Sequence, residues 1–337
     1  MVAQHAENLF SIPIPLPNNP LKNLNAYVLI GHRNLLIDTG FRLDACRNAL
    51  MFGLSELGIS MDNTDIFLTH LHSDHTGLAP EIAKPGTQIF IGEHDLNHMP
   101  GRQNTFSWRD SDRRFAAEGF PKSLLQVLTE KNPAQRLSPV PYDGYIPVKD
   151  GEIFSYGGHS FQAIWTPGHT PGHLCLLETS TGICILGDHV LFDITPNITR
   201  WHGVPDSLGD YLQSLQHMEA MPVTLPLPAH RAVHTTFQAR CQALIRHHRQ
   251  RCEEILRILS GQAPMTAWDI AARMTWNIRC HDWSDFPTPQ KWFAVGEAMA
   301  HLDHLIALGM VERTLVQSLY LYSSLQKEGN HGSDTLS

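Results

Sequence analysis

The stretch that decides the fold is His70-Leu71-His72-Ser73-Asp74-His75, which comes closely behind the apolar run Ile66-Phe67-Leu68. Four side chains that can bind a borderline metal ion are thereby packed into one turn at the end of an expected strand. A tight loop at this point can direct His70 and His72 toward one metal position. Asp74 and His75, on the next turn, can then point to a neighbouring metal position. Zinc accepts imidazole and carboxylate ligands, and a hydrolytic zinc site keeps one position for water. One loop could therefore serve two metal ions.

More histidines lie downstream, each in a turn behind an apolar run. They are His169 and His173 in Thr166-Pro167-Gly168-His169-Thr170-Pro171-Gly172-His173, His189 beside Asp188, and His230 in Pro228-Ala229-His230. Since each follows a β-like run, we expect them all at one edge of a sandwich, where a rigid scaffold positions functional loops. A further histidine, His234, is close enough to His230 to compete with it for that place.

Taken in this order, the patterns HxHxDH, TPGHTPGH and GDH and the late histidine resemble the metallo-β-lactamase superfamily, over about residues 9–235. The resemblance implies an α/β fold, an αββα sandwich. It also implies one metal ion bound by three histidines, a second bound by a different trio, and an aspartate that bridges both. In this sequence the first trio is His70, His72 and His169, the second is Asp74, His75 and His230, and the bridge is Asp188.

The same resemblance implies the chemistry of the site. Two zinc ions would hold a hydroxide between them, and we expect Asp74, Asp188 and His173 to take part in catalysis. Asp188 would anchor the hydroxide, and His173 could donate a hydrogen bond to the substrate oxygen. His189, like His173, is also a candidate for supporting a ligand or contacting the substrate. Iron or manganese would suit the same ligands, but zinc is the default expectation.

Composition narrows the class of protein. A chain of 337 residues is long enough for one large domain and a small one. Its 25 basic and 33 acidic residues give a net charge of −8, which opposes attraction to nucleic acid or anionic lipid. Six scattered cysteines favour reduced thiols. Because there is no apolar run of bilayer-spanning length and no basic, apolar secretory start, we expect a soluble, cytoplasmic protein that does not bind membranes.

The residues before the metal-binding stretch predict a hairpin and a helix. Asn25 to Ile30 and Asn34 to Ile37 are β-like runs joined by a short turn. A helix is expected from about Leu43 to Leu57, stopped by Gly58. The resemblance implies that Asp38, between these elements, lies beneath the metal loop and orients a ligand histidine. The alternative is an ordinary turn carboxylate.

Residues from about 97 to 141 interrupt the alternation of helices and strands. They are polar and irregular and include Arg109, Arg113 and Arg114. Long loops in compact domains tend to be functional, so we expect a lid over the site within a catalytic domain of residues 1–236. A surface pair of helices is the alternative.

A second domain is expected over residues 237–325, followed by a disordered tail over 326–337. Its pattern predicts helices over about 241–259, 266–274 and 288–308 and then a hairpin, an order that resembles a winged helix. Residues 241–337 carry 9 basic and 10 acidic side chains, whereas a helix that binds a DNA groove normally needs several basic ones. We therefore expect the domain to serve packing or a homodimer rather than DNA binding.

The substrate is predicted less directly than the site. β-Lactamases of this superfamily carry a cysteine where this chain has Asp188, so the resemblance is closer to the glyoxalase-II-like branch. Members with a winged-helix tail resemble acyl-thioesterases or endoribonucleases, and the acidity of this chain favours the first. We expect a small-molecule acyl substrate, a thioester or an ester, with lactone opening as a variant.

Two other classes of function stay open. An endoribonuclease or phosphodiesterase could use the same two-metal centre, and the arginine group at 109–114 would then lead to the site. A binding or regulatory module with structural metal ions is the third hypothesis. Structural zinc sites are closed and usually rich in cysteine, which does not match these ligands.

Overall fold

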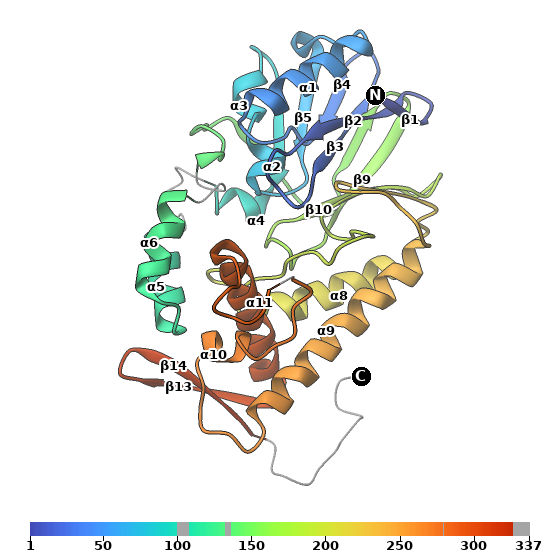
Figure 1. Cartoon of the computed structure of the whole chain (residues 1–337). Coiled ribbons are helices and arrows are strands. Elements are labelled where there is room, and N and C mark those ends of the chain that lie inside the picture. The colour runs from blue at the N-terminus through green and yellow to red at the C-terminus, as the bar shows by residue number, and fades with distance from the viewer. Residues whose placement is uncertain (100–107, 132–135, 279, 326–337) are drawn as a thin grey trace. The chain divides into compact units, whose positions relative to one another are not determined.

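The computed structural model of the chain describes residues 1–99, 108–131, 136–278 and 280–325 (Figure 1). Backbone contacts group these residues into two compact units. The first unit contains the described residues within 1–105, 132–196 and 214–241. The second contains those within 106–131, 197–213 and 242–337. None of the described helices has the length and apolar character needed to span a bilayer.

A mixed sheet forms one layer of the first unit (Figure 1). In the described part of the chain its order is β1 (Ala3–Ala6), β2 (Leu9–Pro15), β3 (Asn23–Leu29), β4 (Asn34–Ile37), β5 (Thr64–Leu68), β6 (Ile89–Gly92) and β7 (Tyr145–Val148). The pairs from β1 to β4 are antiparallel and those from β4 to β7 are parallel. The expected hairpin of β3 and β4 is thereby confirmed.

The second sheet sets the direction of the strands that lead to the downstream histidines. Among the described residues its order is β12 (Leu225–Pro228), β11 (Ile183–Gly187), β10 (Leu174–Glu178), β9 (His159–Trp165) and β8 (Ile153–Tyr156). Strand β10 is antiparallel to both β9 and β11, and β11 is parallel to β12. Strands β9, β11 and β12 therefore run the same way, and their carboxyl ends lie at one edge.

Two apolar clusters hold these layers together. Between the sheets, the ring of Phe67 on β5 packs edge-on against Phe154 on β8, with ring centres 5.0 Å apart. On the other face of the first sheet, helix α1 (Asp44–Glu56) buries Leu50 and Leu54. Gly53 lets α1 approach β2 closely, because a Cβ there would lie 2.4 Å from a methyl of Ile12. Each large apolar side chain buried this way contributes roughly 1.5–3 kcal/mol.

The second unit contains the expected series of three helices and a hairpin. The elements that make up this series are the carboxyl-terminal part of α9 (Phe237–Leu259), α10 (Ala267–Ala271), α11 (Thr288–Ala307), β13 (Val311–Val316) and β14 (Leu319–Ser324). The expected cap of α10 is present, since the Thr266 hydroxyl accepts from the backbone N–H of Asp269 and the Asp269 carboxylate accepts from that of Thr266. The winged-helix resemblance itself stays a prediction, and the tail over 326–337 lies outside the described residues.

The segment expected as a lid forms two helices, α5 (Trp108–Ala117) and α6 (Lys122–Lys131), which contact each other. They group with the second unit, not with the catalytic domain of residues 1–236 in which we expected them. The reason lies in buried charges: Arg200 forms ion pairs with Glu118, just after α5, and with Asp303 on α11. The hydroxyl of Tyr322 on β14 adds a 2.9 Å bond to Glu118. Helix α8 (Ser207–Glu219) and α9 each begin in one unit and end in the other.

Candidate metal centre

The seven side chains expected to bind metal all follow strands of the first unit. The loop after β5 carries His70 and His72, and the short helix α2 (Ser73–Thr76) that continues it carries Asp74 and His75. The remaining three follow β9, β11 and β12 and are His169, Asp188 and His230. Because β9, β11 and β12 run the same way, their loops meet at one edge of the sandwich, as we expected from the sequence.

The structure brings these side chains into three overlapping groups. One consists of His70, His72 and His169, the first predicted trio. The second predicted trio, Asp74, His75 and His230, forms another, and His70, His75 and Asp188 form a third. In each group the candidate ligand atoms all lie within 4.8 Å of one another. That spacing suits a metal ion at the centre of each predicted trio.

Asp188 faces both predicted trios with different oxygens. Its Oδ2 lies 3.6 Å from Nε2 of His169, which belongs to the first trio. Its Oδ1 lies 3.3 Å from Nε2 of His230 and 3.7 Å from Nε2 of His75, which belong to the second. One carboxylate is thereby placed between the two groups.

The polar atoms at the centre of this cluster fit metal binding. Nε2 of His75, Nε2 of His230 and Oδ1 of Asp188 are buried and make no hydrogen bond to any residue that the structure describes. A metal ion coordinated at this point would satisfy all three atoms at once. Imidazole nitrogen and carboxylate oxygen together suit zinc, iron and manganese.

Electrostatics divide the cluster into two parts. Burial, reinforced by neighbouring histidines, lowers the pKa of His72 to about 3 and holds that of His70 well below its usual value. These imidazoles are neutral, which is the form that binds metal. Burial also acts on His230, but Asp188 and Asp74 outweigh it and raise its pKa to about 10. This second part of the cluster favours positive charge.

Groups behind the ligands fix the direction of their rings. Asp38 accepts from Nδ1 of His75 over 2.8 Å and from the backbone N–H and hydroxyl of Thr69 over 2.9 and 2.8 Å. Nδ1 of His230 donates to the backbone carbonyl of Asn23 over 2.8 Å. Both rings are therefore held with Nε2 toward the cluster, as outer partners of metal ligands typically do. Asp38 takes the position beneath the metal loop that the resemblance implied.

His173 does not take the position expected of a donor to substrate. It is fully buried, and its Nε2 accepts a hydrogen bond from the backbone N–H of Asp188. With that nitrogen already occupied as an acceptor, the ring cannot donate from it to a substrate oxygen. His173 instead supports the backbone of Asp188. The sequence could not show this, because the bond depends on how the segments that carry the two residues are placed side by side.

The positions of the two late histidines favour His230 as the candidate ligand. His230 is buried, with Nε2 3.4 Å from Oδ2 of Asp74. The side chain of His234 is 53% exposed and pairs with Asp193 over 3.2 Å. His189 is buried, and burial lowers its pKa to about 3. Of the arginine group, Arg113 pairs with Asp110 on α5 in the second unit, and the side chain of Arg109 lies outside the described residues.

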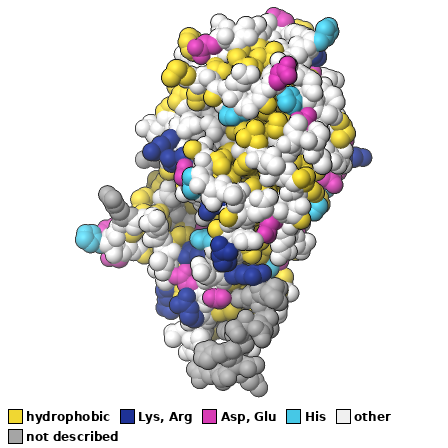
Figure 2. Space-filling view, turned by 90° about the vertical axis from the view of Figure 1, so that its right-hand side faces the viewer, with side chains coloured by type: hydrophobic (Ala, Val, Ile, Leu, Met, Phe, Trp, Pro, Cys, Tyr) yellow, Lys and Arg dark blue, Asp and Glu magenta, His cyan; other side chains and the backbone are white. Residues whose placement is uncertain are grey.

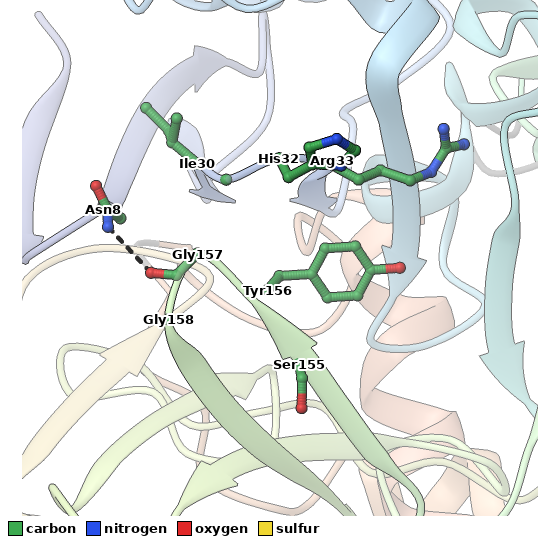
Figure 3. Close-up of a pocket in the computed structure, with 9 residues that line it drawn as sticks. Asn8, Ile30, His32, Arg33, Ser155, Tyr156, Gly157 and Gly158 are labelled. Atoms are coloured by element: carbon green, nitrogen blue, oxygen red, sulfur yellow. Dashed lines mark hydrogen bonds between the residues drawn. The ribbon is translucent and has the colours of Figure 1, made fainter.

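Two hollows of the first unit lie away from the centre of the cluster. The one in Figure 3, of about 630 Å³, is formed by the turns at residues 30–33 and 155–158. It lies where β4 and β5 begin, opposite the edge where the metal loop follows β5. Its Arg33 and Tyr156 are both engaged with Asp65, over 2.6 and 2.9 Å. A second hollow, of about 990 Å³, is lined on one side by Pro228 and Arg231, which flank His230.

The sandwich, the ligand loops at one edge and the overlapping His and Asp groups together define a metal-binding hydrolase fold. The profile of the metallo-beta-lactamase superfamily matches residues 20–230. The chain therefore belongs to the metallo-beta-lactamase superfamily, which is hydrolytic and whose fold implies the binding of divalent metal.

Two curated proteins and one solved structure illustrate what the chain is similar to. Lactamase-like protein nscB of Neosartorya fischeri is 28% identical over 243 residues, 71% of this chain and 57% of that protein, so the chain spans little more than half of this relative. The atrochrysone carboxyl ACP thioesterase of Aspergillus fumigatus is 24% identical over 64% of this chain and 39% of its own length. The crystal structure of a metallo-beta-lactamase family protein from Thermus thermophilus has a TM-score of 0.79 and 29% identity, covering 95% of this chain and 99% of that one.

Proposed function

We propose that the protein is a hydrolase with two zinc ions that cleaves small acyl thioesters or related esters. The observation that carries this proposal is the position of Asp188, whose two carboxylate oxygens face different trios of candidate ligands. A structural site would need only one closed set of ligands, whereas two trios sharing a carboxylate are the arrangement of a two-metal hydrolytic centre.

Each side chain then has a definite task. His70, His72 and His169 would hold one zinc ion, and Asp74, His75 and His230 the other, with Asp188 between them. When bound, two such ions supply a hydroxide nucleophile at neutral pH and stabilise negative charge on the attacked group. Asp38 keeps the ring of His75 in place, and His173 keeps the backbone of Asp188 in place.

Several observations favour acyl substrates over phosphodiesters. The net charge of −8 opposes attraction to a phosphate backbone. On the face drawn in Figure 2, basic side chains lie in small groups with acidic side chains among them. One similar protein is named as a thioesterase acting on an acyl group of a carrier protein. A thioester of coenzyme A or of a carrier protein presents the same reacting bond.

The test measures kcat/KM of the zinc-loaded protein for four substrates: an acyl-coenzyme-A thioester, a lactone, a phosphodiester and a short RNA. Chelated protein and the Asp188→Asn variant serve as controls for contaminating hydrolases. We expect the thioester to be cleaved fastest and only by zinc-loaded wild-type protein. If RNA or the phosphodiester is cleaved fastest, the nuclease hypothesis replaces this proposal. If the lactone is opened fastest, the substrate class becomes cyclic esters.

A further inference from the structure

A buried carboxylate outside the seven candidate ligands joins two of the ligand loops. Asp95 lies on the short helix α4 (Glu93–Leu96), which directly follows β6, and its side chain is fully buried. Its Oδ2 accepts from the backbone N–H of Leu71 over 2.8 Å and from the hydroxyl of Thr170 over 2.7 Å. Its Oδ1 accepts from the backbone N–H of Gly172 over 2.6 Å. These donors come from segments about a hundred residues apart in the chain.

Each of the two segments carries ligands of the first trio. Leu71 is the residue between His70 and His72, and Thr170 directly follows His169. Asp95 is therefore linked to the two loops whose histidines make up the first trio. The ligands His75 and His230 of the second trio are held from behind by other groups, namely Asp38 and the carbonyl of Asn23.

The packing around Asp95 leaves little freedom for these loops to shift. A Cβ on Gly172 would lie 2.1 Å from the backbone nitrogen of Asp95, and one on Gly92 would lie 2.1 Å from the carbonyl oxygen of Gly172. The backbone of α4 and the loop of His169 are thus in direct contact. Burial raises the pKa of Asp95 to about 6 despite its three donors, so keeping an anion here costs free energy. A carboxylate kept at such a cost indicates a task beyond filling space.

We propose that Asp95 is a positioning residue that sets the distance between the His70–His72 loop and the His169 loop and thereby controls the affinity of the first metal site. This inference rests on the proposed two-metal function. It assigns to Asp95 an effect on one site of the pair, whereas a merely structural carboxylate would change the stability of the whole unit and both metal affinities together.

The variant Asp95→Asn removes this support with the smallest change of shape. One carboxylate oxygen becomes an NH2 group, which faces the N–H of either Leu71 or Gly172. Because two donors cannot form a hydrogen bond, that bond is lost. Zinc alone is the probe: the number and affinities of bound zinc ions are measured by elemental analysis after equilibration in zinc buffers. We expect one site to weaken by at most roughly 10–100-fold, the cost of losing a group bonded directly to a ligand, because Asp95 acts through the residues beside the ligands. The other site should keep its affinity.

Matched variants identify which site has changed. His230→Ala removes a candidate ligand of the second trio alone and should abolish binding at the other site. Asp65→Asn, a buried carboxylate bound to Arg33 at the opposite edge, should change neither affinity. Absorption spectra of the cobalt-substituted proteins distinguish the histidine trio from the trio that contains Asp74. Asp95→Asn and His230→Ala should therefore lose different absorption bands.

Each outcome decides the proposal. Two zinc ions bound to Asp95→Asn with wild-type affinity, or an equal loss at both sites, would overturn it. If Asp95→Asn fails to fold, Thr170→Val removes only one of the three bonds, and it should weaken the same single site by a smaller factor; an unchanged affinity would count against the role of Asp95. Wild-type protein that binds fewer than two zinc ions would overturn the proposed function itself, a failure seen without any variant.

Discussion

The backbone N–H of Asp188 donates a hydrogen bond to Nε2 of His173 over 3.1 Å. Because Nε2 is an acceptor, the proton of this ring is on Nδ1, which lies 2.8 Å from the hydroxyl of Thr166. Burial holds the pKa of His173 well below its usual value, so the ring stays neutral. Gly187 is needed for this contact, since a Cβ there would lie 2.6 Å from the same nitrogen.

Replacing His173 tests this support. We expect His173→Leu, which keeps the bulk and removes the acceptor, to lower metal retention and turnover together by roughly 10–100-fold. The reason is that the N–H of Asp188 is left without a partner and its carboxylate is no longer fixed. Metal content and kcat at saturating zinc are the measurements. Full metal content with reduced kcat would instead support the original prediction that His173 contacts the substrate directly.

Removing the shared carboxylate should have the larger effect. In Asp188→Ala we expect the loss of one metal ion and a fall in turnover beyond the roughly 100-fold that an outer partner typically contributes. Elemental analysis and steady-state kinetics measure both. Asp193→Asn, an exposed carboxylate in the loop that follows, is the control and should behave as wild type. An active Asp188→Ala protein with two metal ions would remove the bridging role.

The two late histidines can be compared directly. His230→Ala should lose the second metal ion, because Nε2 of His230 is buried and has no hydrogen-bond partner among the described residues. His234→Ala should keep both metal ions, since its ring is largely exposed and pairs with Asp193. Zinc content of the two variants, purified side by side, is the measurement. Metal loss in His234→Ala alone would reverse the assignment.

The pair of His159 and Glu178 predicts a dependence of stability on pH. Burial lowers the pKa of His159, but hydrogen bonds to Glu178 and to the carbonyl of Glu7 outweigh it and raise the pKa. Its stabilisation is therefore complete below the unfolded pKa of about 6.5 and is lost as pH rises through the folded value. Burial raises the pKa of Glu178, but Thr181 and His159 outweigh it and lower the pKa. That stabilisation is complete above about pH 4.3 and is lost as pH falls through the folded value.

The pair should accordingly stabilise the protein most between about pH 4.3 and 6.5. We expect His159→Gln to lower the free energy of unfolding by roughly 0.2–1 kcal/mol within that window and by less at high pH. Urea unfolding of both proteins at about pH 5.5 and about pH 9 measures the difference. An equal difference at the two pH values would show that the charge of His159 does not contribute.

Much of the fold follows from local patterns. The hairpin of β3 and β4, the helix that ends before Gly58 and the capped start of α10 all lie where turn, cap and periodicity signals predict them. The strands β1, β2, β7 and β8 and the helix α8 are not predicted by these signals, because they are short or lack a clear period. The predictions of a homodimer and of a cytoplasmic location stay predictions.

By itself the sequence determined that four candidate metal ligands lie together, since His70, His72, Asp74 and His75 share one turn and their spacing is a local property of the chain. It also predicted that the other candidate ligands follow strands. Only the tertiary structure buried His230 beside Asp74 and left His234 exposed. It also placed the backbone N–H of Asp188 against His173 and linked Asp95 to two loops. It also grouped α5 and α6 with the second unit, where Arg200 pairs with Glu118 just after α5 and with Asp303. The physical reason is that these bonds connect residues far apart in the chain, and their partners are set by how strands and helices pack rather than by the order of residues along any one of them.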